Sequence, residues 1–169
     1  RSPHARATFQ VGDLGAFVAG SDGIETILSA RDIPGENSFG VYPHLKDQPV
    51  FADGHVRYRG EAVLAIIGTR EAVDGINFGD LPIEWQPQDA VTGVDAALQS
   101  GATTVHDSTP GNILTTGRLR KGEMDAAFQS AAVADGTLQT AFVEHAYIEP
   151  EAGFAERVGN RIEVTVVFS

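Results

Sequence analysis

The sequence predicts a mixed α/β fold, because strand and helix signals follow one another in its middle third. The strongest strand signal is His55–Gly68, which contains a continuous apolar run after a glycine bend. Thr69 is a good N-cap for a helix that follows it directly. Leu81–Trp85 then alternates apolar and polar residues, which is typical of a half-buried strand. The order of these signals predicts a β-α-β unit over Val63–Trp85.

The residues before this unit give weaker signals. Small and apolar residues at Pro3–Phe9 are compatible with a strand, and Gly12–Ala19 could be a short helix or a loop. Ile24–Ser29 has the composition of a strand, and the turn Asp32–Gly35 ends it with a proline and a glycine. Gly35–Val50 lacks a regular period and is expected to be a connecting loop of functional length.

The second half of the chain predicts a smaller unit behind a linker. One or two helical turns are expected at Asp95–Gln99. Residues 101–122 are rich in Thr, Gly and Pro and are expected to be an extended linker at a domain boundary. A helical period indicates a helix at Asp125–Ala134. Strands are expected at Gly136–Phe142 and Ile162–Phe168, with a tight hairpin turn at Gly159-Asn160.

Composition excludes several classes of function. The chain has 169 residues, no cysteine, and 23 acidic against 12 basic residues, for a formal net charge of −11. No apolar run approaches the ~20 residues that span a bilayer, and the negative charge disfavours nucleic-acid binding. The absence of cysteine excludes disulfides and thiolate metal sites in this chain and fits the cytoplasm. The acidic excess is expected to be a solvated surface, with contacts to basic partner subunits as the alternative.

The stretch VEHAYIEPEAGFA, Val143–Ala155, concentrates reactive side chains in one run. Pro150 is incompatible with a regular helix and favours an extended conformation for the residue before it. Neighbouring side chains of a strand point to opposite faces, so His145, Tyr147 and Glu149 are expected to share one face and could line a site.

This stretch resembles the start of the molybdenum-binding region of the xanthine dehydrogenase and aldehyde oxidase family. Further stretches are similar to the family at compatible places in the chain. They are RSPHARA at 1–7, ARDIPGENSFG at 30–40, the run DQPVFADGHVRYRGEAVLAIIGTREAV at 47–73, and GEMDAAFQSAAV at 122–133. The resemblance therefore covers nearly the whole chain.

The resemblance implies a fold and a domain order. Residues 1–100 would be an α/β hammerhead domain, 101–122 a linker, and 123–169 the N-terminal piece of the molybdopterin-binding domain. The second unit is expected to be small, β-rich and incomplete. A chain that begins inside one strand and ends inside another looks like a fragment of a longer enzyme, and we expect it to be inactive alone.

The resemblance also implies an activity for the intact enzyme. That enzyme would catalyse oxidative hydroxylation of an N-heterocycle or an aldehyde. Its molybdopterin would be held by segments outside this chain, with iron–sulfur and FAD centres on partner domains or subunits. The family's catalytic glutamate lies downstream, so no catalytic residue is expected here. The alternative is a stand-alone, non-catalytic assembly module that keeps the hammerhead fold.

His145 and Glu149 are the candidate site residues, because they could orient groups that later segments supply near the cofactor. The favoured alternative is a structural role, in which the histidine bonds a carboxylate or carbonyl inside a packed strand. Structural or solvent-exposed roles are also expected for His4 and His44, and no motif supports His55 or His106. The histidines show no metal-ligand spacing.

Motifs for three further classes of site are missing from the sequence. It contains no nucleophile elbow, dinucleotide fingerprint or phosphate-binding loop. Glu61, which follows Gly60, could bring a carboxylate near a neighbouring domain, although a charged residue at a strand edge is the simpler interpretation.

Overall fold

The computed structural model describes residues 1–40, 44, 46–141, 143, 148 and 152–167. The chain divides into two compact units, Arg1–Gly117 and Arg118–Ser169, and each is described by itself. The division falls inside the stretch 101–122 that was expected to be a linker. Helices and antiparallel sheets occur together, which confirms the predicted mixed α/β class.

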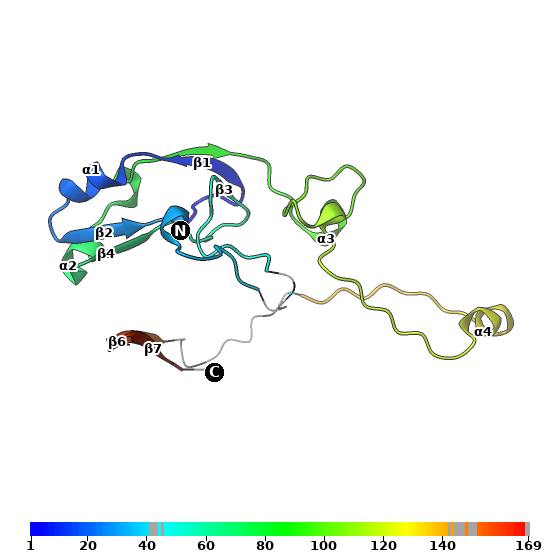
Figure 1. Cartoon of the computed structure of the whole chain (residues 1–169). Coiled ribbons are helices and arrows are strands. Elements are labelled where there is room, and N and C mark those ends of the chain that lie inside the picture. Colours follow the sequence, from blue (N-terminus) through cyan, green and yellow to red (C-terminus); the bar gives the residue numbers. More distant parts are fainter. Residues whose placement is uncertain (41–43, 45, 142, 144–147, 149–151, 168–169) are drawn as a thin grey trace. The chain divides into compact units, whose positions relative to one another are not determined.

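The first unit contains a three-stranded and a two-stranded antiparallel sheet (Figure 1). In the first sheet β1 (Ala7–Val11) lies between β3 (His55–Val56) and β5 (Ile83–Pro87). In the second, β2 (Ile24–Leu28) pairs with β4 (Ala65–Gly68). The helices are α1 (Leu14–Ala19), α2 (Arg70–Asp74) and α3 (Val94–Ala97), and 3-10 turns span Ala30–Asp32, Phe78–Asp80 and Pro110–Asn112.

The core of this unit lies under the three-stranded sheet. Ala7, Phe9 and Val56 come from its strands, and Val63 packs against them from the segment that leads to β4. The Phe9 and Trp85 rings pack with centroids 5.1 Å apart. Strand β1 therefore supplies alternate residues to the core from a central position, as the period of a strand requires.

The predicted β-α-β unit is wrong in its pairing. Strand, helix and strand do follow one another as β4, α2 and β5, but β4 pairs with β2 while β5 pairs with β1. Thr69 caps α2 as predicted, because its Oγ1 accepts a hydrogen bond from the Ala72 amide at 3.3 Å. A β-α-β unit would pair β4 with β5 in parallel. Each of these strands instead has an antiparallel partner, β2 for β4 and β1 for β5.

The predicted buried strand before Thr69 is also shorter than expected. The chain turns at Gly60, whose φ is +93°, and regular strand geometry resumes only at Ala65. Between these points the Ala62 carbonyl accepts a hydrogen bond from the amide of Ala52, which lies in a loop and not in a strand. Ile67 in β4 remains 41% exposed, because it belongs to a sheet of only two strands.

The first part of the predicted linker is folded and not extended. The Asn112 side chain accepts a hydrogen bond from the Val105 amide at 2.7 Å and donates to the carbonyls of Ala97 and Thr103 at 3.0 and 3.1 Å. Asn112 also adopts φ +57°, a conformation that asparagine tolerates better than most residues. One side chain therefore closes the loop between α3 and the 3-10 turn.

Replacement of Asn112 by alanine should destabilise the first unit by about 2 kcal/mol, because three hydrogen bonds are lost and alanine is strained at positive φ. Urea unfolding followed by the fluorescence of the single tryptophan, Trp85, would measure this. Asn112→Gly removes the same bonds without the strain, so it should cost less. Equal stability of the wild type and Asn112→Ala would contradict the proposed role.

The second unit contains α4 (Met124–Ser130) and the hairpin of β6 (Gly153–Val158) and β7 (Arg161–Val166). Gly159 turns the hairpin with φ +62°, as predicted. The predicted helix to Ala134 ends earlier, because Ala131 is already extended. The predicted strand at Gly136–Phe142 is wrong for residues 136–141, which pair with no strand among the described residues.

Candidate functional site

The two candidate residues predicted from the sequence, His145 and Glu149, lie outside the described residues. The described end of the same stretch, Gly153–Ala155, is part of β6 and is extended as expected. Two described neighbours, Val143 and Ile148, are 75% and 94% exposed. The role of the candidate pair therefore stays a prediction.

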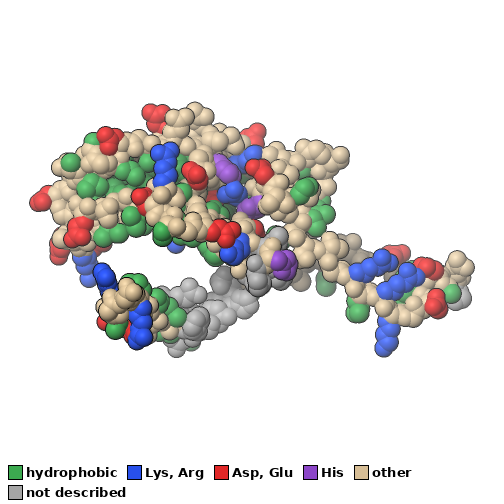
Figure 2. All heavy atoms as spheres, viewed as in Figure 1, with side chains coloured by type: hydrophobic (Ala, Val, Ile, Leu, Met, Phe, Trp, Pro, Cys, Tyr) green, Lys and Arg blue, Asp and Glu red, His purple; other side chains and the backbone are tan. Residues whose placement is uncertain are grey.

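The structure instead brings together residues that the sequence did not single out. His55 lies in β3, Arg57 directly follows this strand, and His106 comes from the folded loop after α3. The electrostatic interactions of His106 include Arg57, His55, Asp47 and Glu61. Figure 2 shows histidine, arginine and carboxylate side chains side by side on the visible face of the first unit. No spacing in the sequence links these positions, so only the fold reveals the cluster.

A buried ion pair anchors this cluster. Glu61 is only 2% exposed, and its carboxylate accepts hydrogen bonds from the Arg57 amide at 2.5 Å and from Arg57 Nη1 at 3.4 Å. The simpler interpretation of Glu61 as a charged residue at a strand edge is therefore wrong. The turn at Gly60 folds the carboxylate back over the end of β3, since the Glu61 amide donates to the Tyr58 carbonyl.

The same turn fixes the N-terminal segment. The Ser2 amide donates to the Glu61 carbonyl at 2.8 Å, and the Gly60 amide donates to the Ser2 carbonyl at 2.9 Å. His4 follows directly and packs edge-on against Trp85, with ring centroids 5.4 Å apart. The contacts of His4 agree with the structural role that was expected for it.

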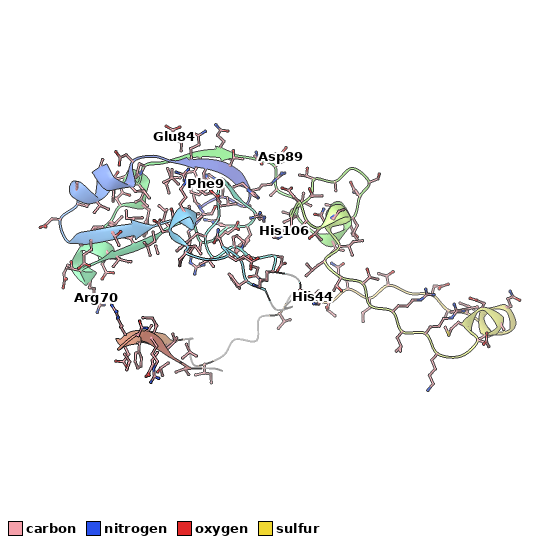
Figure 3. The ribbon with its side chains drawn as sticks, viewed as in Figure 1. Phe9, His44, Arg70, Glu84, Asp89 and His106 are labelled. Atoms are coloured by element: carbon pink, nitrogen blue, oxygen red, sulfur yellow. The ribbon has the colours of Figure 1, made fainter. Side chains whose placement is uncertain are left out.

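Burial lowers the pKa of His106 below its ordinary value, and the positive charge of Arg57 lowers it further. The carboxylates of Asp47 and Glu61 act in the opposite direction, and His55 adds to the lowering. His106 is therefore favoured in its neutral form in the folded chain. Figure 3 shows the position of His106 on the first unit.

The stability of the first unit should fall as the pH drops below about 6.5, the ordinary pKa of histidine. The unfolded chain then binds a proton at His106 more readily than the folded chain, so protonation favours unfolding. Urea unfolding at pH 7.5 and 5.5 would measure the loss, and His106→Asn should make it smaller. The lowered pKa values of Asp32 and Glu36 act at a lower pH and do not produce this effect. An unchanged pH dependence in the variant would contradict the assignment.

Within the described part of the chain, no group of three or more His, Cys, Asp or Glu side chains could hold a metal ion. No helix among those residues is long and apolar enough to cross a membrane.

The cavity beside α4 in the second unit does not fit a molybdopterin. The cavity beside α4 is lined by apolar side chains such as Met124, Ala127 and Phe128. A molybdopterin would need hydrogen-bond donors for its phosphate and polar ring, and this cavity offers none from the side chains that line it.

A family model described as the molybdopterin cofactor-binding domain matches residues 105–169. The nicotinate dehydrogenase large molybdopterin subunit of Eubacterium barkeri is 34% identical over 173 residues, which cover 99% of this chain and 38% of that subunit. A probable xanthine dehydrogenase subunit of Bacillus subtilis is 28% identical over 79% of this chain and 18% of its own length. Xanthine dehydrogenase 1 of Arabidopsis thaliana is 28% identical over 99% of this chain and 12% of its own length.

These matches place the chain in a class that is defined by a molybdopterin cofactor-binding domain and by relatives named as dehydrogenases. Within that class the chain belongs to the xanthine dehydrogenase family, which confirms the resemblance found in the sequence. The chain spans about 38% of the length of the nicotinate dehydrogenase subunit and less of the other two relatives.

Proposed function

We propose that this chain is a scaffold piece of a molybdenum hydroxylase that oxidises an N-heterocycle or an aldehyde. The observation that carries the proposal is the match to the molybdopterin subunit of nicotinate dehydrogenase along 99% of the chain. Residues 1–100 would form the hammerhead domain, 101–122 the connection, and 123–169 the first piece of the molybdopterin-binding domain. The folded loop closed by Asn112 would make the connection more rigid than a linker.

The chain alone is expected to be inactive. The described apolar residues of the second unit are largely exposed, with Leu119 and Leu138 at 97% and 91%. A two-stranded hairpin is marginally stable by itself, so β6 and β7 would need the remaining molybdenum-binding domain to cover them. Iron–sulfur and flavin domains or subunits are the further partners that the proposal requires, and the small-molecule substrate would bind among these partners. The cytoplasm is the proposed location.

The native protein would test the proposal directly. An antibody raised against the chain would capture it from its source, and mass spectrometry and metal analysis would follow. We expect a polypeptide much longer than the 17.9 kDa of this chain, with molybdenum bound and with iron on it or on co-purifying subunits. A metal-free polypeptide of about this mass would instead support the stand-alone assembly module.

His145 and Glu149 are proposed as positioning residues in the intact enzyme. Glu149→Gln should lower kcat less than about tenfold with normal molybdenum content, because the side chain would act through another group. Glu144→Gln is the matched control, since a strand would place Glu144 on the opposite face. Complete loss of turnover in Glu149→Gln at normal cofactor content would assign Glu149 a direct role in the reaction.

A further inference from the structure

A cavity of about 390 Å³ in the first unit lies where β1, β3 and the loop after α3 meet. Arg6, His55 and Arg57 line it from the sheet side, and Asp53 and Asp107 also contribute to its wall. The three basic side chains are partly buried, whereas both aspartates are exposed. Basic and acidic side chains therefore line the same cavity, and the aspartates are the more exposed of the two kinds.

Neither arginine in the wall is fully satisfied by the described residues. Arg6 Nη1 donates to the Asp89 carbonyl at 3.2 Å, and Arg6 forms no ion pair within the described part of the chain. Arg57 has a contact of 3.4 Å with Glu61, and its buried Nε has no hydrogen-bond partner among the described residues. The unpaired Nε of Arg57 is unusual, because buried side-chain donors are normally hydrogen-bonded.

We propose that this cavity binds a small oxyanion, a carboxylate or a phosphate, through Arg6 and Arg57. Guanidinium groups present paired N–H donors in the spacing that carboxylate and phosphate oxygens accept. The hydroxyl group of Thr104 lines the same cavity and can donate a further hydrogen bond. The exposed carboxylates of Asp53 and Asp107 repel extended polyanions, which restricts the ligand to a small one.

The affinity of this cavity for an oxyanion depends on the protonation state of His106. Its neighbours in sequence, Val105 and Asp107, both line the cavity, and its imidazole feels the positive charge of Arg57. A bound oxyanion offsets that charge and therefore raises the pKa of His106. By linkage, the oxyanion binds more tightly when His106 is protonated. Asp47, Glu61 and His55 are the other titratable groups that act on His106.

The proposal does not depend on the enzymatic function, and the intact 169-residue chain is sufficient to test it. Sulfate and acetate would each be added in increasing concentration at constant ionic strength, with chloride as the reference anion. Sulfate stands in for phosphate because its charge does not change near neutral pH. Calorimetry gives the dissociation constant, and NMR of the His106 ring gives its pKa. We expect saturable binding and a rise of the His106 pKa by at least about half a unit. Tighter sulfate binding would assign a phosphate ligand, and tighter acetate binding a carboxylate.

Arg6→Gln should weaken binding about tenfold or more, because one charged donor pair is lost. Arg6→Lys, which keeps the charge but not the paired donors, should give an intermediate effect. Arg70→Gln is the matched control, since Arg70 lies on α2 with an 89% exposed side chain and does not line the cavity. Binding no stronger than that of chloride, or equal binding in Arg6→Gln, would overturn the proposal.

Discussion

Val56→Asp should abolish the cooperative folding of the first unit, with a loss of at least about 4 kcal/mol. Val56 is fully buried in β3 and belongs to the core cluster with Ala7, Phe9 and Val63. The core residues around this position are apolar and offer a carboxylate no hydrogen-bonding or charged partner. The aspartate must therefore either take up a proton or disrupt the packing of the core. Urea unfolding followed by Trp85 fluorescence would detect the loss, because Trp85 packs against the same cluster.

Two further substitutions separate charge from volume in this result. Val56→Ala leaves a small cavity and should cost about 2 kcal/mol. Val94→Asp introduces the same carboxylate at the start of α3, where the valine is 72% exposed, and should change the stability by less than about 0.5 kcal/mol. A Val56→Asp variant as stable as Val94→Asp would show that β3 does not close the core.

The local signals of the sequence predicted much of the first unit. The helix cap at Thr69 depends on one side chain and its next few residues, and the strand at Ile24–Leu28 depends on composition over a short window. The hairpin turn at Gly159 likewise needs only a residue that accepts positive φ. These features are determined within a few residues, so the sequence is sufficient to predict them.

Strand pairing and loop closure could not be predicted in the same way. The partner of β4 is a strand far back in the chain, and the sequence pattern of β4 is equally compatible with a parallel neighbour. Asn112 closes a loop by bonding Ala97, Thr103 and Val105, a contact set that has no sequence period. Such long-range choices depend on which surfaces remain unpaired after the local elements form.

The candidate site also combines features that the sequence predicts with features that only the fold reveals. The family was predictable, because it rests on several stretches whose order along the chain is itself a signal. The cluster of His55, Arg57 and His106 was not, since each residue taken singly is an ordinary basic side chain. The burial of Glu61 was also missed, because an acidic residue after glycine usually marks an exposed turn.

Glu61→Gln should destabilise the first unit by about 3 kcal/mol, because it removes the charge that compensates a partly buried guanidinium. The side chains of Glu61 and Arg57 are 2% and 18% exposed, so water compensates the arginine only in part. The amide of glutamine can still accept the hydrogen bond from the Arg57 backbone, which keeps the turn at Gly60 formed. The loss therefore reports the ion pair and not the turn.

The exposed pair of Arg70 and Asp74 is the matched control for this effect. It has the same spacing in the chain and the same 3.4 Å separation, but its side chains are 89% and 69% exposed. Asp74→Asn should therefore cost less than about 0.5 kcal/mol. Removing the arginine as well, in Arg57→Met with Glu61→Gln, should restore part of the stability, because no unpaired charge then remains. The contrary result is additivity, in which the double variant loses the sum of the stability losses of Glu61→Gln and Arg57→Met. The two charges would then not be coupled, and Glu61 would act only through the backbone of the turn.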